Sequence, residues 1–364
     1  MKRSRLYDEH SKRGASFIEQ GGWEVPAHYG NAAAEHLAVR RGVGIADLSQ
    51  RGKIRVTGDD RTKWLQSVIS NDILPLAQGQ GTYSSLLTHK GKMLTYFRVY
   101  QLGEALMLED VGEIGDVTYA ALRKFLLFGT KAKMESLIES YGHLLISGPK
   151  AVDLLSAATG LEIGGLKPLE FLAHESDGRP ALLIRTEETG EKDFELLIPA
   201  GSCLVEVWNR IWAAGEAIGL QAFGAHALES LRVEAGLPKA GPDLNENIVP
   251  PEANLEGKAF SLTKGCYPGQ EVVARMDTYG SVRRRLVGLV LEGNSVPPPG
   301  SKLFSGDREV GWITSAVHSP SLAKVIAFGF PLRDFTPVGT PLTVEIHGER
   351  KPATVHALPF IKGS

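Results

Sequence analysis

The chain has few cysteines, no long apolar run and almost no excess charge, and each shortage excludes a class of protein. Only Cys203 and Cys266 occur among the 364 residues, so a disulfide scaffold is excluded and a reducing compartment is favoured. Two thiols without a nearby pair of histidines also argue against a protein-bound zinc ion or metal cluster. No stretch approaches the ~18 apolar residues of a membrane helix, and the basic start is not followed by a signal-peptide run. We expect a cytoplasmic protein with no stably bound metal and no membrane contact.

The balance of charge disfavours a general polyanion binder. The formal net charge is −2, from 40 Lys and Arg residues against 42 Asp and Glu residues. Three consecutive arginines, Arg283-Arg284-Arg285, could meet phosphates, but such a run is more often a solvated surface. Direct contact with nucleic acid is therefore not expected, although a scaffold that binds tRNA through these arginines stays an alternative.

The length and a repeated pattern predict more than one folding unit. A strand, a glycine turn and an amphipathic helix occur across residues 53–69 and again across residues 144–158. They predict two similar α+β halves, about 45–140 and 141–240. From residue 285 onward, short strands alternate with Gly, Pro and Ser turns, which predicts a small all-β barrel or sandwich. We expect one larger domain over residues 1–280 and a second over residues 281–364.

The most informative segment reads Lys264-Gly265-Cys266-Tyr267-Pro268-Gly269-Gln270-Glu271. Pro268 suits the first position of a helix, which Gln270 and the residues after it would continue. Glu271 and Arg275 lie four positions apart, the spacing of an ion pair along a helix.

The position of Cys266 in this segment favours a reactive thiolate. It precedes the predicted helix, where the helix dipole favours an anion, and Lys264 adds positive charge nearby. Gly265 and Gly269 leave room for a ligand or another backbone to approach. A cysteine in a turn is more often a small packed residue, but this context favours a functional one, whereas Cys203 is expected to pack.

These eight residues resemble the signature of the YgfZ family, which belongs to the folate-binding aminomethyltransferase superfamily together with the glycine cleavage T-protein. The resemblance extends over residues 6–10, 21–24, 44–49, 189–195 and 232–236. It implies an α+β fold, with a ring of ferredoxin-like subdomains around a central folate cavity, followed by a small C-terminal β-barrel.

The resemblance also implies roles for individual residues, with tetrahydrofolate or a one-carbon derivative as the bound cofactor. Glu195 would accept hydrogen bonds from the pterin, and Arg232 would orient the pterin or its glutamate tail. Tyr83 would line the same cavity. Cys266 would be the essential thiol with Lys264 beside it, in a motif that includes Gly265, Tyr267, Gly269, Gln270, Glu271 and Arg275.

Two departures from the transferases decide between the functions that we consider. The transferases carry an acidic pair where this chain has Thr95-Tyr96, and Glu188 replaces a folate-lining tyrosine. Our leading hypothesis is therefore a YgfZ-type protein that assembles or repairs iron–sulfur clusters of unidentified client proteins, including tRNA-modifying enzymes. One alternative is an aminomethyltransferase that moves a one-carbon unit to tetrahydrofolate. Another is a folate-binding scaffold without catalysis.

Overall fold

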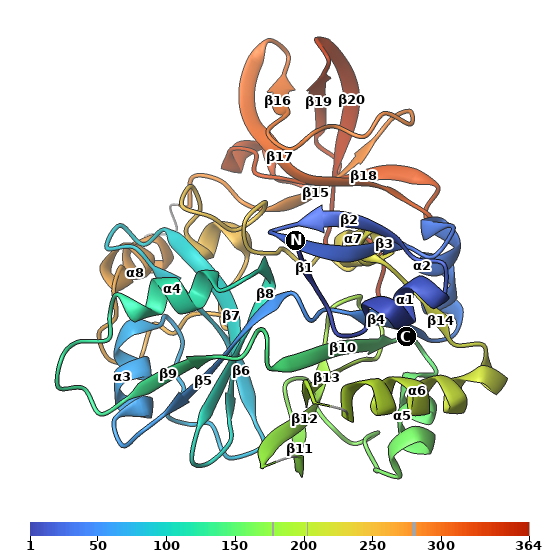
Figure 1. The fold of residues 1–364 in the computed structure, drawn as a ribbon. Coiled ribbons are helices and arrows are strands. Elements are labelled where there is room, and N and C mark those ends of the chain that lie inside the picture. Colours follow the sequence, from blue (N-terminus) through green and yellow to red (C-terminus); the bar gives the residue numbers. More distant parts are fainter. Residues whose placement is uncertain (177, 202, 279–281, 364) are drawn as a thin grey trace.

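The computed structural model describes residues 1–176, 178–201, 203–278 and 282–363 (Figure 1). The chain begins with a small sheet whose strands follow the order β1-β3-β2. This sheet and the first two helices comprise β1 (Lys2–Arg3), α1 (Tyr7–Lys12), β2 (Ser16–Gln20), β3 (Trp23–His28) and α2 (Ala32–Arg41). Asn31 caps α2, since its side-chain oxygen accepts from the backbone N–H groups of Ala33 and Ala34.

Two larger sheets follow, and their elements repeat in the same order. The first sheet is ordered β6-β7-β8-β5-β9 and the second β11-β12-β13-β10-β4-β14. The first unit comprises β5 (Arg51–Thr57), α3 (Arg61–Val68), β6 (Gly81–Leu87), β7 (Met93–Gln101), β8 (Leu106–Ile114), α4 (Val117–Arg123) and β9 (Lys133–Ser136). The second comprises β10 (Tyr141–Ser147), α5 (Ala151–Thr159), β11 (Phe171–Ser176), β12 (Arg179–Thr186), β13 (Asp193–Pro199), α6 (Cys203–Gly215), the 3-10 turn η1 (Glu216–Ile218) and β14 (Gln221–Ala222).

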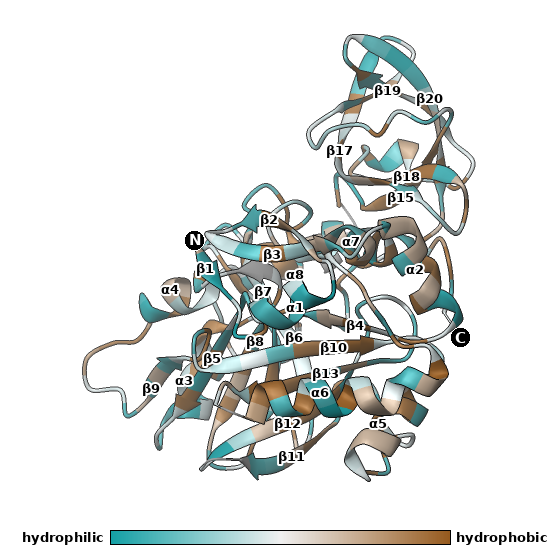
Figure 2. Cartoon of the chain, turned by 45° about the vertical axis from the view of Figure 1, so that its right-hand side comes forward, coloured by the Kyte–Doolittle hydropathy of each residue, from teal (hydrophilic) through white to brown (hydrophobic). Residues whose placement is uncertain are grey.

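Both units therefore run strand, helix, three strands, helix, strand. The difference between them is β4 (Gly44–Asp47), which inserts between β10 and β14. Helix α6 covers the second sheet with a stripe of buried residues at helical spacing, Leu204, Trp208, Ile211 and Gly215. Figure 2 shows the same amphipathic character in the alternating colours of this helix.

A closed barrel ends the chain, which confirms the predicted α+β fold with a C-terminal β-barrel. Its strands close in the order β15-β18-β17-β16-β19-β20. They are β15 (Val287–Leu291), β16 (Lys302–Ser305), β17 (Arg308–Ser319), β18 (Lys324–Gly329), β19 (Pro341–Ile346) and β20 (Glu349–His356), with a 3-10 turn η3 (Arg333–Phe335). The predicted boundary between residues 280 and 281 lies outside the described residues.

The barrel stands above the N-terminal sheet and α7 (Ala225–Glu234) in both views (Figures 1 and 2). Helix α7 joins it to the rest of the chain, since the Glu234 carboxylate accepts from the Ser319 and Ser321 hydroxyls. A 3-10 turn η2 (Pro250–Ala253) and α8 (Gln270–Thr278) complete the described elements. Among the described helices, none has the length and apolar character needed to cross a membrane.

The turn before α8 depends on a close approach between two backbones at Gly269. This residue has a φ of 80°, and a Cβ there would lie 2.5 Å from the Thr88 carbonyl oxygen and 2.7 Å from the Gly91 Cα. At Gly265, by contrast, a Cβ would meet nothing within 4 Å, and its φ lies outside the left-handed region. The structure therefore explains one glycine of the motif by packing and leaves the other unconstrained.

We expect Gly269→Ala to destabilise the fold by about 1–3 kcal/mol, because the new methyl group meets backbone atoms in a strained conformation. Gly265→Ala is the matched control and should change stability by less than about 0.5 kcal/mol. Urea unfolding followed by circular dichroism would measure both. Equal destabilisation by the two variants would contradict the packing described for Gly269.

Candidate functional site

A cavity of about 240 Å³ lies where the N-terminal sheet, the two larger sheets and α7 meet. Its apolar walls include Val25, Leu48, Tyr83, Tyr96, Phe223 and Leu228. Its ionisable lining comprises Asp47, Arg51, Glu187, Glu188, His226, Glu229, Arg232, Lys239 and Lys258. A pocket that mixes aromatic walls with converging charges is typical of a site for a polar small molecule.

A second cavity of about 330 Å³ lies on the other side of Tyr83. Three side chains line both spaces, namely Tyr83, Glu187 and Lys258. The Lys258 ammonium lies 4.5 Å from the centre of the Tyr83 ring, and the Tyr83 ring stacks on Tyr96 at 5.5 Å. These three residues therefore form the partition between the two cavities.

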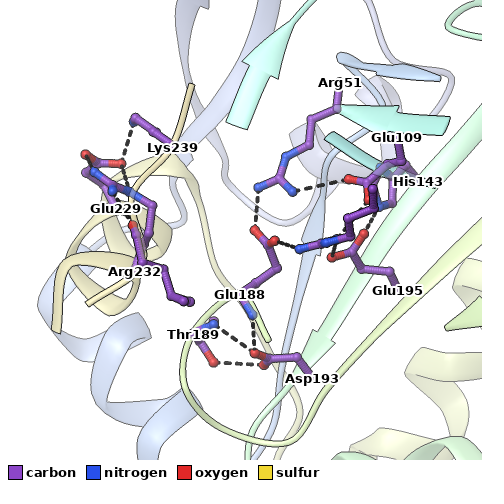
Figure 3. A network of polar contacts seen from close by, with 12 residues as sticks. Arg51, Glu109, His143, Glu188, Thr189, Asp193, Glu195, Glu229, Arg232 and Lys239 are labelled. Atoms are coloured by element: carbon purple, nitrogen blue, oxygen red, sulfur yellow. Dashed lines mark hydrogen bonds and ion pairs between the residues drawn. The ribbon is translucent and has the colours of Figure 1, made fainter. Parts of the chain in front are cut away.

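Two buried arginines connect the halves of the chain at the floor of the central cavity (Figure 3). Arg98 on β7 donates hydrogen bonds from Nη1 to Glu109 and Glu195, each at 2.8 Å. Its Nη2 donates to Glu188. Arg51 donates to the second oxygen of Glu188 at 2.8 Å and lies 3.6 Å from Glu109. This network consists of side chains from β5, β7, β8 and β13 and from the loop after β12.

His143 on β10 completes the network. Its Nε2 lies 2.6 Å from the second Glu195 oxygen. Burial lowers the pKa of His143 to about 4, so the imidazole is neutral at pH 7 and Nε2 is the nitrogen that donates. Burial raises the pKa of Glu109, with the Glu195 charge acting in the same direction. Burial also disfavours the charged form of Glu195, but Arg98 and His143 outweigh it and lower the pKa of that carboxyl.

The metal-ligating groups of this network do not require a metal. The ligand atoms of Glu109, His143 and Glu195 lie within 4.8 Å of one another, a spacing that suits an ion. The Arg98 guanidinium, however, bridges the two carboxylates and supplies the compensating positive charge.

Of the predicted folate contacts, Tyr83 and Arg232 line the central cavity, whereas Glu195 does not. Glu195 is fully buried, and Arg98 and His143 occupy both of its oxygens. The structure thus places Glu195 one layer behind the cavity wall. The hydrogen bonds between Glu195 and a pterin stay a prediction. They would require Arg98 to move away from the Glu195 carboxylate.

Arg232 lines the cavity with all five of its N–H groups already engaged. Its acceptors are Glu229, Asp243, the Leu237 carbonyl and the Ser315 hydroxyl. Burial disfavours a charged Glu229, but Arg232 and Lys239 outweigh it and lower its pKa. Arg232 therefore holds Glu229 at the cavity wall, and Lys239 donates to the same carboxylate at 2.6 Å.

The eight-residue motif lies outside both cavities, among the residues that the structure describes there. Lys264 is buried, and its ammonium donates to the carbonyls of Gln66 and Ile69 at 2.6 Å and of Asn71 at 2.9 Å. These carbonyls lie at and just beyond the C-terminal end of α3, which has no intrahelical donors for them. Burial lowers the Lys264 pKa to about 8. The predicted role of Lys264 beside the thiol is therefore replaced by that of a helix cap.

The other motif residues have separate positions. Cys266 is exposed, and α8 begins four residues later at Gln270, so Pro268 is not its first residue. Tyr267 is buried and donates to the Ser261 carbonyl, while the Gln270 amide donates to the Lys264 carbonyl at 3.3 Å. Glu271 and Arg275 are both exposed. Together these contacts describe a structural turn between α3 and the 89–91 loop.

Two family models match the chain. The GCVT N-terminal domain covers residues 6–262, and the glycine cleavage T-protein C-terminal barrel domain covers residues 284–362. The chain belongs to the glycine cleavage T-protein family. Proteins named aminomethyltransferase from Bacillus subtilis and Streptomyces coelicolor are 31% and 33% identical, each over 100% of this chain and 99% and 98% of their own length. The crystal structure of the glycine cleavage system aminomethyltransferase T from Bartonella henselae superposes with a TM-score of 0.90 at 28% identity, over 99% of this chain and 98% of that one.

These comparisons correct the leading functional hypothesis. The predicted superfamily is confirmed, but the narrower assignment to YgfZ is not. The prediction of an iron–sulfur maintenance protein acting through Cys266 is wrong, because relatives that match over the full length are named aminomethyltransferase. The error arose from weighting one short segment, whose lysine and glycine serve the packing of a turn, above the likeness of the whole chain.

Sequence analysis missed the arginines at the cavity floor, although β7 carries a usable signal. Its residues from Met93 to Tyr100 are buried or nearly so, and Arg98 is the one charged residue among them. A charge within an otherwise apolar buried strand requires compensating carboxylates nearby. Which carboxylates provide the compensation depends on the pairing of distant strands and could not be read from spacing.

We expect Arg98→Met to destabilise the chain by about 3–5 kcal/mol, because it leaves several carboxylates buried without their partner. The matched control is Arg179→Met, since Arg179 lies 3.9 Å from Glu135 with both side chains about half exposed. This control should cost less than about 1 kcal/mol. Urea unfolding measures both, and a similar small effect at Arg98 would contradict the network.

The neutral, buried His143 should make the free energy of unfolding depend on pH in acid. Between pH 6.5 and about 4, the unfolded chain protonates His143 while the folded chain keeps it neutral, so its contribution to stability is lost as pH falls through this window. The loss amounts to about 3 kcal/mol. In His143→Gln the ring is absent, so the difference in unfolding free energy between wild type and variant should shrink by that amount from pH 7 to pH 4. A difference that does not change with pH would contradict a neutral buried imidazole.

Proposed function

We propose that the chain binds a reduced folate in the central cavity and transfers a one-carbon unit to it from an amine-bearing carrier. The observation that carries this proposal is the cavity itself, which is lined by the N-terminal sheet, both larger sheets and α7. Support comes from the full-length likeness to relatives named aminomethyltransferase. The proposal replaces our leading hypothesis with the alternative of a one-carbon transferase.

The lining suits a flat heterocycle with an anionic tail. Tyr83 and Tyr96 offer an aromatic wall on which a pterin ring can pack. Lys258 offers an ammonium inside the cavity, and Lys239 offers one that is partly exposed, so both can attract carboxylates of the tail. Arg232 then acts by holding Glu229, which accepts from Lys239, and Glu195 acts by holding Arg98.

Tetrahydrofolate binding tests the first half of this proposal. We expect Tyr83→Ala to weaken binding about 10-fold, because the variant removes an aromatic contact of the cavity wall. Tyr7→Ala is the control, since Tyr7 stacks on Phe17 and does not belong to the cavity lining. Isothermal titration calorimetry under anaerobic conditions would measure both. Binding that is absent in the wild type, or unchanged in Tyr83→Ala, would contradict the proposed site.

Turnover tests the second half. With tetrahydrofolate and an aminomethyl-loaded lipoyl carrier protein, the wild type should release ammonia. Cys266→Ser should do so at the wild-type rate, because the exposed thiol lies outside the described cavity lining. Folate binding without ammonia release would support the alternative of a folate-binding scaffold. Loss of turnover in Cys266→Ser would show that the thiol takes part after all.

A further inference from the structure

The acidic side chains of the central cavity differ in whether they have partners. Asp47 accepts from His10 at 2.9 Å and from the Ser4 and Ser49 hydroxyls. Glu188 and Glu229 are each held by two cations, as described above. The fourth acid, Glu187, makes no hydrogen bond or ion pair with any residue that the structure describes. It is therefore the carboxylate of the described lining that remains available to a ligand.

The backbone at Glu187 is held firmly even though its carboxylate is not. In the loop that follows β12, the buried Asp193 accepts from the backbone N–H groups of Glu188 at 2.7 Å and Thr189 at 2.8 Å (Figure 3). Arg40 donates to the Thr189 carbonyl at 3.0 Å. The anchored backbone after Glu187 limits the space that its carboxylate can reach to the neighbourhood of the two cavities.

Glu187 is exposed, and its side chain lies at the rim that the two cavities share. It lines both cavities beside Tyr83 and Lys258. Among the described residues, the Lys258 ammonium has no hydrogen-bonding or ion-pair partner, and burial lowers its pKa, which the Glu187 charge opposes. An acid and an amine without fixed partners thus lie on the partition between two cavities.

We propose that Glu187 is the catalytic carboxylate of this chain and that it does the work for which the transferases use an acid at the positions of Thr95 and Tyr96. This inference rests on the proposed one-carbon transfer. Tyr96 on β7 lines the same cavity as Glu187, which follows β12. The Glu187 carboxylate therefore faces the same cavity as the positions where the transferases carry their acid. In this assignment the negative charge is supplied by the loop after β12 in place of β7.

The proposed step is a transfer between two nitrogens. A folate nitrogen forms a bond to the carbon of the aminomethyl group while the bond from that carbon to the amine breaks. The attacking nitrogen becomes cationic until it loses its proton to Glu187, and Glu187 returns that proton to the amine, which leaves as ammonia. The second folate nitrogen then bonds to the same carbon while the bond from that carbon to the carrier sulfur breaks, and the proton of this nitrogen goes to the sulfur, which leaves as a thiol. A carboxylate near the cationic nitrogen stabilises it electrostatically and accepts its proton. Neither Thr95 nor Tyr96 provides a negative charge, since burial raises the pKa of Tyr96 well above its usual value.

Ammonia release by purified variants tests this assignment. We expect Glu187→Gln to lower kcat about 100-fold, the size of effect typical of losing a general base, while the Kd for tetrahydrofolate changes less than about 3-fold. Glu187→Asp should recover part of the lost rate, since it keeps the charge on a shorter side chain. The control is Glu175→Gln on β11, an exposed acid outside both described cavity linings, which should match the wild type.

The outcomes separate this inference from the function on which it rests. Wild-type turnover with an unimpaired Glu187→Gln variant overturns the assignment of Glu187 and leaves the transferase function standing. A variant that loses folate binding in the same proportion as turnover also overturns it, because Glu187 would then be a binding residue. A wild type that binds folate and releases no ammonia overturns both. Circular dichroism and the unfolding midpoint of each variant establish that the fold is intact.

Discussion

The two halves of this chain depend on one buried guanidinium. Arg98 extends from β7 of the first half, and its carboxylate partners come from β8 of the same half and from β13 and the loop after β12 of the other. A guanidinium that is fully buried without such partners would cost several kcal/mol, so neither half can bury its share of the charges alone. The network therefore fixes the relative position of the two sheets as well as the floor of the cavity between them.

The same constraint determines what the cavity can use. Glu195 accepts from Arg98 and His143 through its two oxygens, and all five N–H groups of Arg232 are engaged by protein. A ligand that required these groups would first have to break interactions that stabilise the fold. Binding and chemistry are consequently easier at side chains whose backbone is held but whose charge is not matched, and in the described lining Glu187 and Lys258 have that property.

The fold could be predicted from the sequence to a large extent, because its signals are local. Strand, glycine turn and helix recur at residues 53–69 and 144–158, and short strands with turns mark the barrel. The site was harder to predict because its contacts are long-range. Arg98 and Glu195 are 97 positions apart in the chain. Their side chains come within hydrogen-bonding distance only once β10 has paired with β13 and β5 with β8. Tyr83 and Arg232 line the cavity, and their contact with folate stays a prediction, whereas the full engagement of Arg232 by its neighbours follows from tertiary packing alone.

The segment around Cys266 illustrates how a residue pattern can be informative about structure while misleading about chemistry. A lysine, two glycines and a tyrosine at fixed spacing are what the turn needs, since Lys264 caps α3, Gly269 admits the 89–91 loop and Tyr267 fills the core. These packing requirements account for the residues of the turn whether or not Cys266 reacts. The test that separates the two cases is whether a polar group has its partners inside the protein. Lys264 has three acceptors for its three protons and is structural, whereas Glu187 and Lys258 have no hydrogen-bonding or ion-pair partner among the described residues and remain available to a substrate.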